Sequence, residues 1–130
     1  MTKRIIDANL NRLREGIRVV EDIARYVYED ASISKRLKSL RHKSQIDVED
    51  LLKHRDILND PNKETTKSES SRKNLKSIII ANFKRAQEAS RVLEEILKLD
   101  DTPYSQIFKD IRYELYDIEK NILIDNKFNG

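Results

Sequence analysis

Asparagine, arginine and glutamate recur in this chain as two identically spaced sets, with three residues from each member to the next. The two sets are Asn9, Arg12 and Glu15, and Asn82, Arg85 and Glu88. A guanidinium group binds phosphate through two parallel hydrogen bonds. Carboxylate oxygens suit Mg²⁺, which commonly shares its ligands with substrate phosphates. The two sets therefore predict an anion site with carboxylates available for a metal.

The sets belong to an internal repeat. Residues 8–23 match residues 81–96 at an offset of 73 without a gap, and eight of the sixteen positions are identical. A weaker match relates residues 37–41 to residues 108–112 at an offset of 71. The repeat predicts two copies of one helical hairpin.

Apolar residues recur with the 3.6-residue period of helices, and the chain has only two glycines and two prolines. Four helices are predicted: one from an N-cap at Asp7 to about residue 29, then 34–53, 66–99 and 103–124. Thr66 and Glu69 form a predicted capping box. The prediction is all-α: a single domain over 1–130, folded as an up-down-up-down four-helix bundle. Its repeated halves, about 5–53 and 66–125, are joined by loop 54–65, and dimeric packing of the same hairpins stays open.

The composition narrows the classes of partner. Net charge is +3, there is no cysteine, and no apolar run is long enough for a signal or a membrane span. We expect a cytoplasmic protein with a small-molecule substrate, and neither a nucleic acid nor a membrane as partner.

A helical wheel sets Asn9 near the middle of the apolar face, Arg12 at its edge and Glu15 beyond, while Glu21 lies on the opposite side. Asp22 and Glu95 extend the two polar flanks. The flanks could face each other across one groove between the two related helices. The alternative is that they form hydrogen bonds and ion pairs that fix the register of the bundle. Arg41 lies on the apolar side of its helix and needs a carboxylate or a ligand as partner.

Residues 7–22, Asp-Ala-Asn-Leu-Asn-Arg-x-Arg-Glu-Gly-x-Arg-Val-x-Glu-Asp, resemble the small bacterial family of hydroxymethylpyrimidine-phosphate kinases. The resemblance extends to Leu40-Arg41-His42, to Arg55-Asp56 and to Ala81-Asn82-x-x-Arg85-x-x-Glu88. Members occur alone or fused in front of a thiamine-phosphate synthase barrel, which this sequence lacks. One departure is Asp60-Pro61-Asn62, where Asp-Val-Gly is expected.

The resemblance implies a phosphomethylpyrimidine kinase. It would transfer the γ-phosphoryl group of ATP, with Mg²⁺, to 4-amino-5-hydroxymethyl-2-methylpyrimidine phosphate for thiamine biosynthesis. Such a reaction needs positioning and charge neutralisation more than a strong base. We therefore assign expected roles by residue type. The catalytic set is Arg12, Arg85, Glu15 and Glu88; the substrate and phosphate set is Asn9, Asn82, Arg41 and Arg55; the metal ligands are Asp22 and Glu95.

Two other functions fit the same residues. One is an arginine-lined mutase of the chorismate-mutase type, which would need neither ATP nor metal. The other is a non-catalytic, anion-binding regulatory helical module, which would bind phosphate ligands without turnover.

Overall fold

The computed structural model describes residues 2–46, 73–99, 103–125 and 128. The described residues contain helices and no strand. In chain order the elements are α1 (Thr2–Asp22), the π-helix η1 (Ile23–Val27), α2 (Ala31–Lys43), α5 (Leu75–Ile96), the 3-10 helix η2 (Leu97–Leu99) and α6 (Tyr104–Ile124). The predicted all-α class is thereby confirmed.

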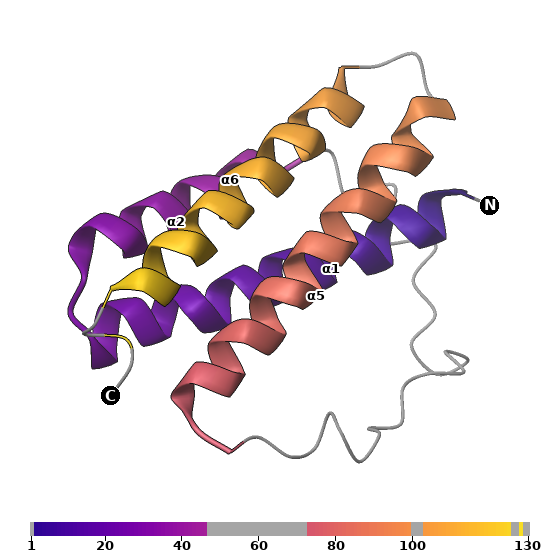
Figure 1. Cartoon of the computed structure of the whole chain (residues 1–130). Helices are drawn as coiled ribbons and strands as arrows, with labels where there is room; N and C mark the ends of the chain where they lie inside the picture. The colour runs from indigo at the N-terminus through magenta and orange to yellow at the C-terminus, as the bar shows by residue number, and fades with distance from the viewer. Residues whose placement is uncertain (1, 47–72, 100–102, 126–127, 129–130) are drawn as a thin grey trace.

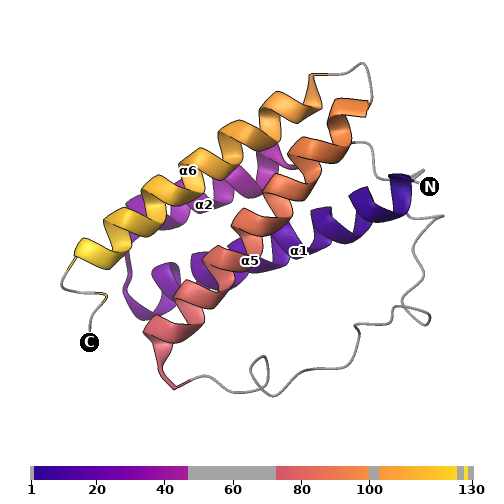
Figure 2. The same ribbon diagram turned by 45° about the vertical axis from the view of Figure 1, so that its right-hand side comes forward.

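The four long helices form a bundle of two antiparallel hairpins, α1–α2 and α5–α6 (Figures 1 and 2). Helix α1 packs on α2 and α5, and α6 packs on α5 and more loosely on α2. Figure 1 shows α1 and α5 side by side and running in opposite directions, so α2 and α5 run the same way. Helices α1 and α6 run one way and α2 and α5 run the other way, so the order along the chain is up-down-down-up and the predicted up-down-up-down order is wrong. The axis that relates the two hairpins therefore lies across the helices rather than along them.

Local signals explain where the described helices begin. The Asp30 side chain accepts a hydrogen bond from Ile33 N at 2.9 Å and caps α2. Asn74 and Ser77 form a reciprocal capping box at the start of α5. Helix α1 already begins at Thr2, so the predicted N-cap at Asp7 is wrong: Asp7 is buried within the helix. Ile6, next to Asp7, packs in the core, which favours continuing the helix toward the N-terminus.

The core is continuous through all four helices and consists of aliphatic side chains with Phe83 and Phe108 at its centre. Helices α1 and α5 approach closely at Gly16, where a Cβ atom would lie 2.9 Å from Asn82 O and 3.4 Å from the Ala86 Cβ atom. We call this contact between Gly16, Asn82 and Ala86 the α1–α5 seam. It lies inside the repeated segment, so the two copies of the repeat pack on each other.

Several predictions fall outside the described residues: Arg55, loop 54–65, the departure at 60–62, and the capping box at Thr66 and Glu69. Helix α2 ends at Lys43 rather than near Lys53, and residues 47–72 are not described. Among the described helices, none is long and apolar enough to cross a membrane.

Candidate functional site

The two predicted asparagines, of which Asn82 belongs to the α1–α5 seam, make the same hydrogen bond. Asn9 Nδ2 donates to Ile5 O at 2.9 Å, and Asn82 Nδ2 donates to Ile78 O at 2.8 Å. Each partner is a carbonyl one turn earlier in the same helix. The amide nitrogens are therefore held by their own helices, as a buried amide requires, and the repeat is reproduced at atomic level.

Arg12 and Arg85 lie close to the seam along their helices. Arg12 precedes Gly16 by one turn, and Arg85 lies between Asn82 and Ala86 in sequence. Both arginines are exposed, as are Glu15 and Glu88. No ion pair joins these four side chains to any described residue. On this part of the surface, two guanidinium groups from facing helices are thus available to a ligand.

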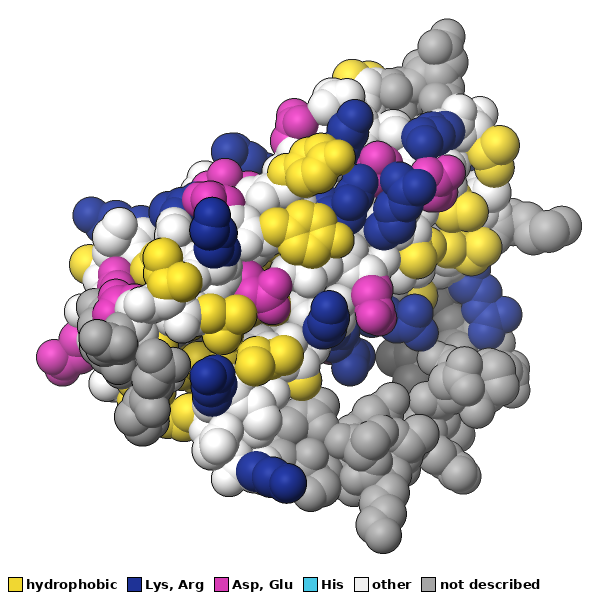
Figure 3. All heavy atoms as spheres, viewed as in Figure 1, with side chains coloured by type: hydrophobic (Ala, Val, Ile, Leu, Met, Phe, Trp, Pro, Cys, Tyr) yellow, Lys and Arg dark blue, Asp and Glu magenta, His cyan; other side chains and the backbone are white. Residues whose placement is uncertain are grey.

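Figure 3 shows this region as a mixed surface, with Lys and Arg side chains beside Asp and Glu side chains over α5. An anion approaching the seam therefore meets positive groups flanked by carboxylates. Carboxylate and phosphate oxygens together are ligands that Mg²⁺ prefers in proteins.

A glutamate and an arginine that also recur in both repeats form one ion pair inside each hairpin. Arg41 Nε donates to Glu21 Oε1 at 2.9 Å, and Arg112 Nη2 lies 2.9 Å from Glu94 Oε2. Glu21 and Glu94 are related by the offset of 73, and Arg41 and Arg112 by the offset of 71. The partner that Arg41 needs is thus a carboxylate of the preceding helix. This contact gives Arg41 a structural partner, whereas the sequence assigned it to phosphate.

These contacts also set the protonation of the arginines. Hydrogen bonds to Glu21 raise the pKa of Arg41 above its ordinary value, against the opposing effect of partial burial. Burial would lower the pKa of Arg112, but its contacts with Tyr116 and Glu94 raise it overall. Both guanidinium groups therefore stay charged. Each forms its ion pair with a carboxylate of the neighbouring helix.

Sequence reasoning left out Glu21 and Glu94, although their identity in both repeats was visible. The wheel set Glu21 on the side opposite the apolar stripe, yet only 3% of the residue is exposed. Helix α2 covers that side, and a wheel drawn for one helix does not contain its neighbour.

The two predicted metal ligands are both engaged in ion pairs on the surface. Asp22 pairs with Arg18 at 3.2 Å; Glu95 pairs with Arg91 at 2.9 Å and with Lys98 at 2.9 Å. The hydrogen bond from Lys98, together with the charge of Arg91, lowers the pKa of Glu95. Within the described part of the chain, no three acidic or histidine side chains gather as a metal-binding group. Any Mg²⁺ at these carboxylates would therefore complete its shell with waters or ligand oxygens.

The two halves differ around Arg112. Arg112 lies over the rings of Tyr113 and Tyr116, 4.9 Å and 5.9 Å from their centroids. The positions matching these tyrosines at the offset of 71 are His42 and Gln45. Both tyrosines are exposed, and both contact the guanidinium group of Arg112.

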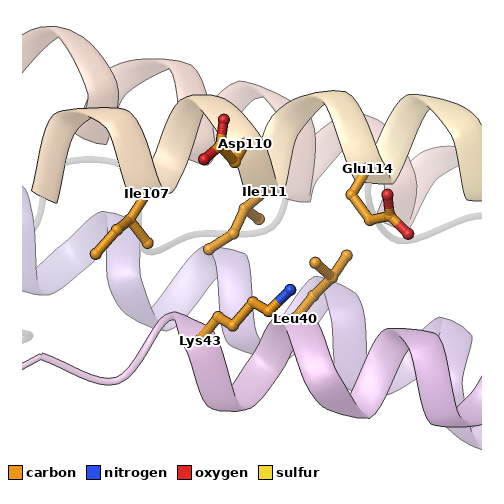
Figure 4. Close-up of a pocket in the computed structure, with 6 residues that line it drawn as sticks. All are labelled: Leu40, Lys43, Ile107, Asp110, Ile111 and Glu114. Carbon is orange, nitrogen blue, oxygen red and sulfur yellow. The ribbon is translucent and has the colours of Figure 1, made fainter.

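A pocket that sequence reasoning did not find lies between α2 and α6, with a volume of about 350 Å³. Figure 4 shows its walls: Leu40 and Lys43 come from α2, and Ile107, Asp110, Ile111 and Glu114 come from α6. No sequence signal marked it, because its floor belongs to the ordinary apolar stripe of each helix.

Comparison with known proteins relates the chain to thiamine biosynthesis. The profile of the ThiD2 family matches residues 4–121. Among curated proteins, the thiamine-phosphate synthase of Thermosynechococcus vestitus is 40% identical over 125 residues, which cover 95% of this chain and 36% of that protein. The thiamine-phosphate synthase of Nostoc punctiforme is 38% identical over 92% of this chain and 35% of its own length. That of Rhodopirellula baltica is 39% identical over 87% of this chain and 32% of its own length.

The chain thus spans about a third of the length of the curated relatives it matches. No solved structure matches it. The relatives correct one expectation from the sequence: they are named for a synthase, a different enzyme from phosphomethylpyrimidine kinase, so the kinase assignment is wrong. The thiamine pathway that the resemblance implied is confirmed. With its fold, its repeat and these relatives in view, the chain belongs to the ThiD2 family of thiamine biosynthesis domains.

Proposed function

We propose that this domain binds a phosphorylated pyrimidine of thiamine biosynthesis across the α1–α5 seam, with Arg12 and Arg85 on the phosphate. One observation carries the proposal: these two exposed guanidinium groups come from facing repeats and have no carboxylate partner among the described residues. Most other arginines of the described helices have one, such as Arg41 with Glu21. A phosphate that bridges the seam would accept charge-assisted hydrogen bonds from both guanidinium groups.

Glu15 and Glu88 give the proposal its second part. They lie one turn beyond the arginines and are exposed without an ion pair to any described residue. In this proposal they hold Mg²⁺ through its waters and so balance the charge of the bound phosphate. The oxygens of Asn9 and Asn82 face the ligand, because each amide nitrogen already donates to its own helix.

The test is calorimetric titration of the full chain with 4-amino-5-hydroxymethyl-2-methylpyrimidine phosphate, with and without Mg²⁺. The unphosphorylated alcohol is the matched ligand control. We expect Arg12→Leu with Arg85→Leu to abolish measurable binding while the thermal unfolding of the free protein stays near that of the wild type. Replacing Lys76 and Lys84 by leucine also removes two exposed positive charges from α5, and should leave binding within about twofold.

Equal binding of the alcohol and the phosphate would contradict the proposal, and so would loss of binding in the Lys76 and Lys84 variant alone. ATP and Mg²⁺ are the cofactors expected from the sequence. Their binding is measured in the same titrations, and ³¹P NMR of those samples reports any change in the phosphates. Phosphoryl transfer from ATP is not part of the proposal, because the relatives are named for a synthase.

A further inference from the structure

The pocket between α2 and α6 is lined by none of the residues used in the proposed function. Its volume of about 350 Å³ is within the range of small-molecule sites. Three apolar side chains form its floor: Leu40, Ile107 and Ile111. Leu40 and Ile111 belong to the core, so the floor is fixed by the packing of the bundle.

Two opposite charges face this floor from the two helices. Figure 4 shows the amine of Lys43 in the gap and the Glu114 carboxylate turned toward α2, whereas Asp110 points away from the gap. Asp110 accepts a hydrogen bond from Gln106 Nε2 at 2.8 Å. Lys43 has no carboxylate within ion-pair distance among the described residues. The pocket thus has a positive and a negative wall that do not neutralise each other.

One oxygen of Glu114 is left for a ligand. Arg36 uses both Nε and Nη2 on Oε1 of Glu114, and its Nη2 also donates to Asp117 Oδ2 at 2.8 Å. These bonds raise the pKa of Arg36, with Asp117 contributing most. Within the described residues, Oε2 of Glu114 accepts no hydrogen bond. Arg36 therefore fixes the carboxylate while its second oxygen faces the gap.

The repeat supplies an independent argument. Leu40 and Ile111 are equivalent at the offset of 71, and so are Lys43 and Glu114. The pocket therefore straddles the axis that relates the two hairpins. The apolar pair has kept its character in both copies, while the polar pair has taken opposite charges. A pocket with Lys43 on one wall and Glu114 on the other suits a ligand that is negative at one end and positive at the other.

We propose that this pocket binds a small amphoteric ring compound. The flat ring lies on Leu40, Ile107 and Ile111, an amino group donates to Glu114 Oε2, and an anionic group accepts from Lys43. One aromatic ring with two short substituents fits within this volume, and both of its charged ends meet a complementary side chain.

The test uses 4-(aminomethyl)benzoate as the probe and follows the methyl signals of the full-length chain by NMR. Benzoate and benzylamine, which each carry one of the two charges, are the ligand controls. We expect saturable shifts at Leu40, Ile107 and Ile111, with both controls binding about tenfold more weakly because each lacks one charge-assisted hydrogen bond.

Two variants locate the charge contacts. Lys43→Glu and Glu114→Gln should each weaken the probe about tenfold. The first removes the donor to the anionic group, and the second removes the negative charge that strengthens the hydrogen bond from the amino group. Lys38→Glu, an exposed lysine of the same helix outside this pocket, should leave its affinity unchanged. Ile107→Trp, at a half-buried position, should fill the gap and block the probe while the bundle stays folded. Probe affinity that is unchanged in Lys43→Glu, or equal for benzoate, would overturn the proposal.

Discussion

At the residue scale, the contact between Glu21 and Arg41 shows how this bundle treats charge. The Glu21 side chain is 4% exposed and that of Arg41 is 16% exposed, with 2.9 Å between Nε and Oε1. Removing charges from water is costly, and their attraction offsets that cost only when the geometry is good. Such a pair adds little net stability while both members are present. Its main energetic effect appears when one member is lost.

We therefore predict that Arg41→Leu lowers the free energy of unfolding by about 3 kcal/mol, because it leaves the Glu21 carboxylate buried without its partner. Replacing Glu21 and Arg41 together by leucine should recover most of that loss. Urea denaturation followed by circular dichroism measures both. Arg18→Leu is the matched control, since it breaks the exposed pair with Asp22 and should cost less than about 1 kcal/mol. A similar loss in Arg41→Leu and Arg18→Leu would show that the Glu21 pair is effectively solvated.

The sequence indicated part of this residue-level picture. The position of Arg41 on an apolar side required a partner, and the two asparagines required fixed ones. What the sequence could not supply was which surface a second helix would cover. Glu21 was therefore placed toward solvent. The need for a partner was predicted for Arg41, but its partner was not identified.

At the element scale, the periodicity of apolar residues predicted four helices because each apolar stripe is long and regular. The ends were harder to predict, since several polar residues compete as N-caps. Asp30 caps α2 four residues before the predicted start at Ser34, and Asn74 with Ser77 caps α5. The π-helix Ile23–Val27 and the left-handed Glu29, with a φ of 52°, had no glycine or proline to signal them.

Gly16 determines how closely α1 and α5 approach. The packing of these two helices can therefore be tested by adding a single Cβ atom at this position. In Gly16→Ala, the new Cβ atom would lie 2.9 Å from the backbone oxygen of Asn82, which cannot move without its helix. Overpacking of this kind costs about 2 kcal/mol. Alanine returns about 1 kcal/mol through its helix propensity. We predict a net loss of about 1 kcal/mol in the free energy of unfolding.

Urea denaturation measures this change, with Ser39→Ala as the control, since Ser39 is exposed and touches no helix interface. If Gly16→Ala proves more stable than the wild type, the two backbones can separate without cost and the seam is not tightly packed.

At the scale of the whole molecule, the repeat explains both the stability of the bundle and the place of the candidate site. The sequence predicted two hairpins, but it did not indicate that their axis lies across the helices. The opposite directions of α1 and α5, which pack on each other at Gly16, show where this axis lies. With this axis, equivalent residues of the two copies face each other at the centre of the seam. Arg12 and Arg85 can then act on one ligand.

The same packing predicts that neither hairpin folds alone. The largest helix contact, between α1 and α5, joins the two halves. Each of these helices contributes almost fully buried side chains to the shared core, including Leu13 and Ile17 of α1 and Phe83 and Leu93 of α5. An isolated hairpin would expose this apolar surface, and helices of this length are only marginally stable without tertiary packing. We therefore expect the separate peptides 1–46 and 73–130 to show weak helicity by far-ultraviolet circular dichroism. Their equimolar mixture should exceed the sum of the two spectra and unfold cooperatively.

Two comparisons make this outcome decisive. A mixture in which peptide 73–130 carries Phe83→Ala should associate more weakly, because a buried aromatic side chain is lost from the shared core. Full helicity in either peptide alone, with no gain on mixing, would instead identify each hairpin as an independent folding unit. The seam would then be a docking surface between two domains, and a ligand bridging Arg12 and Arg85 would have to order that surface as it binds.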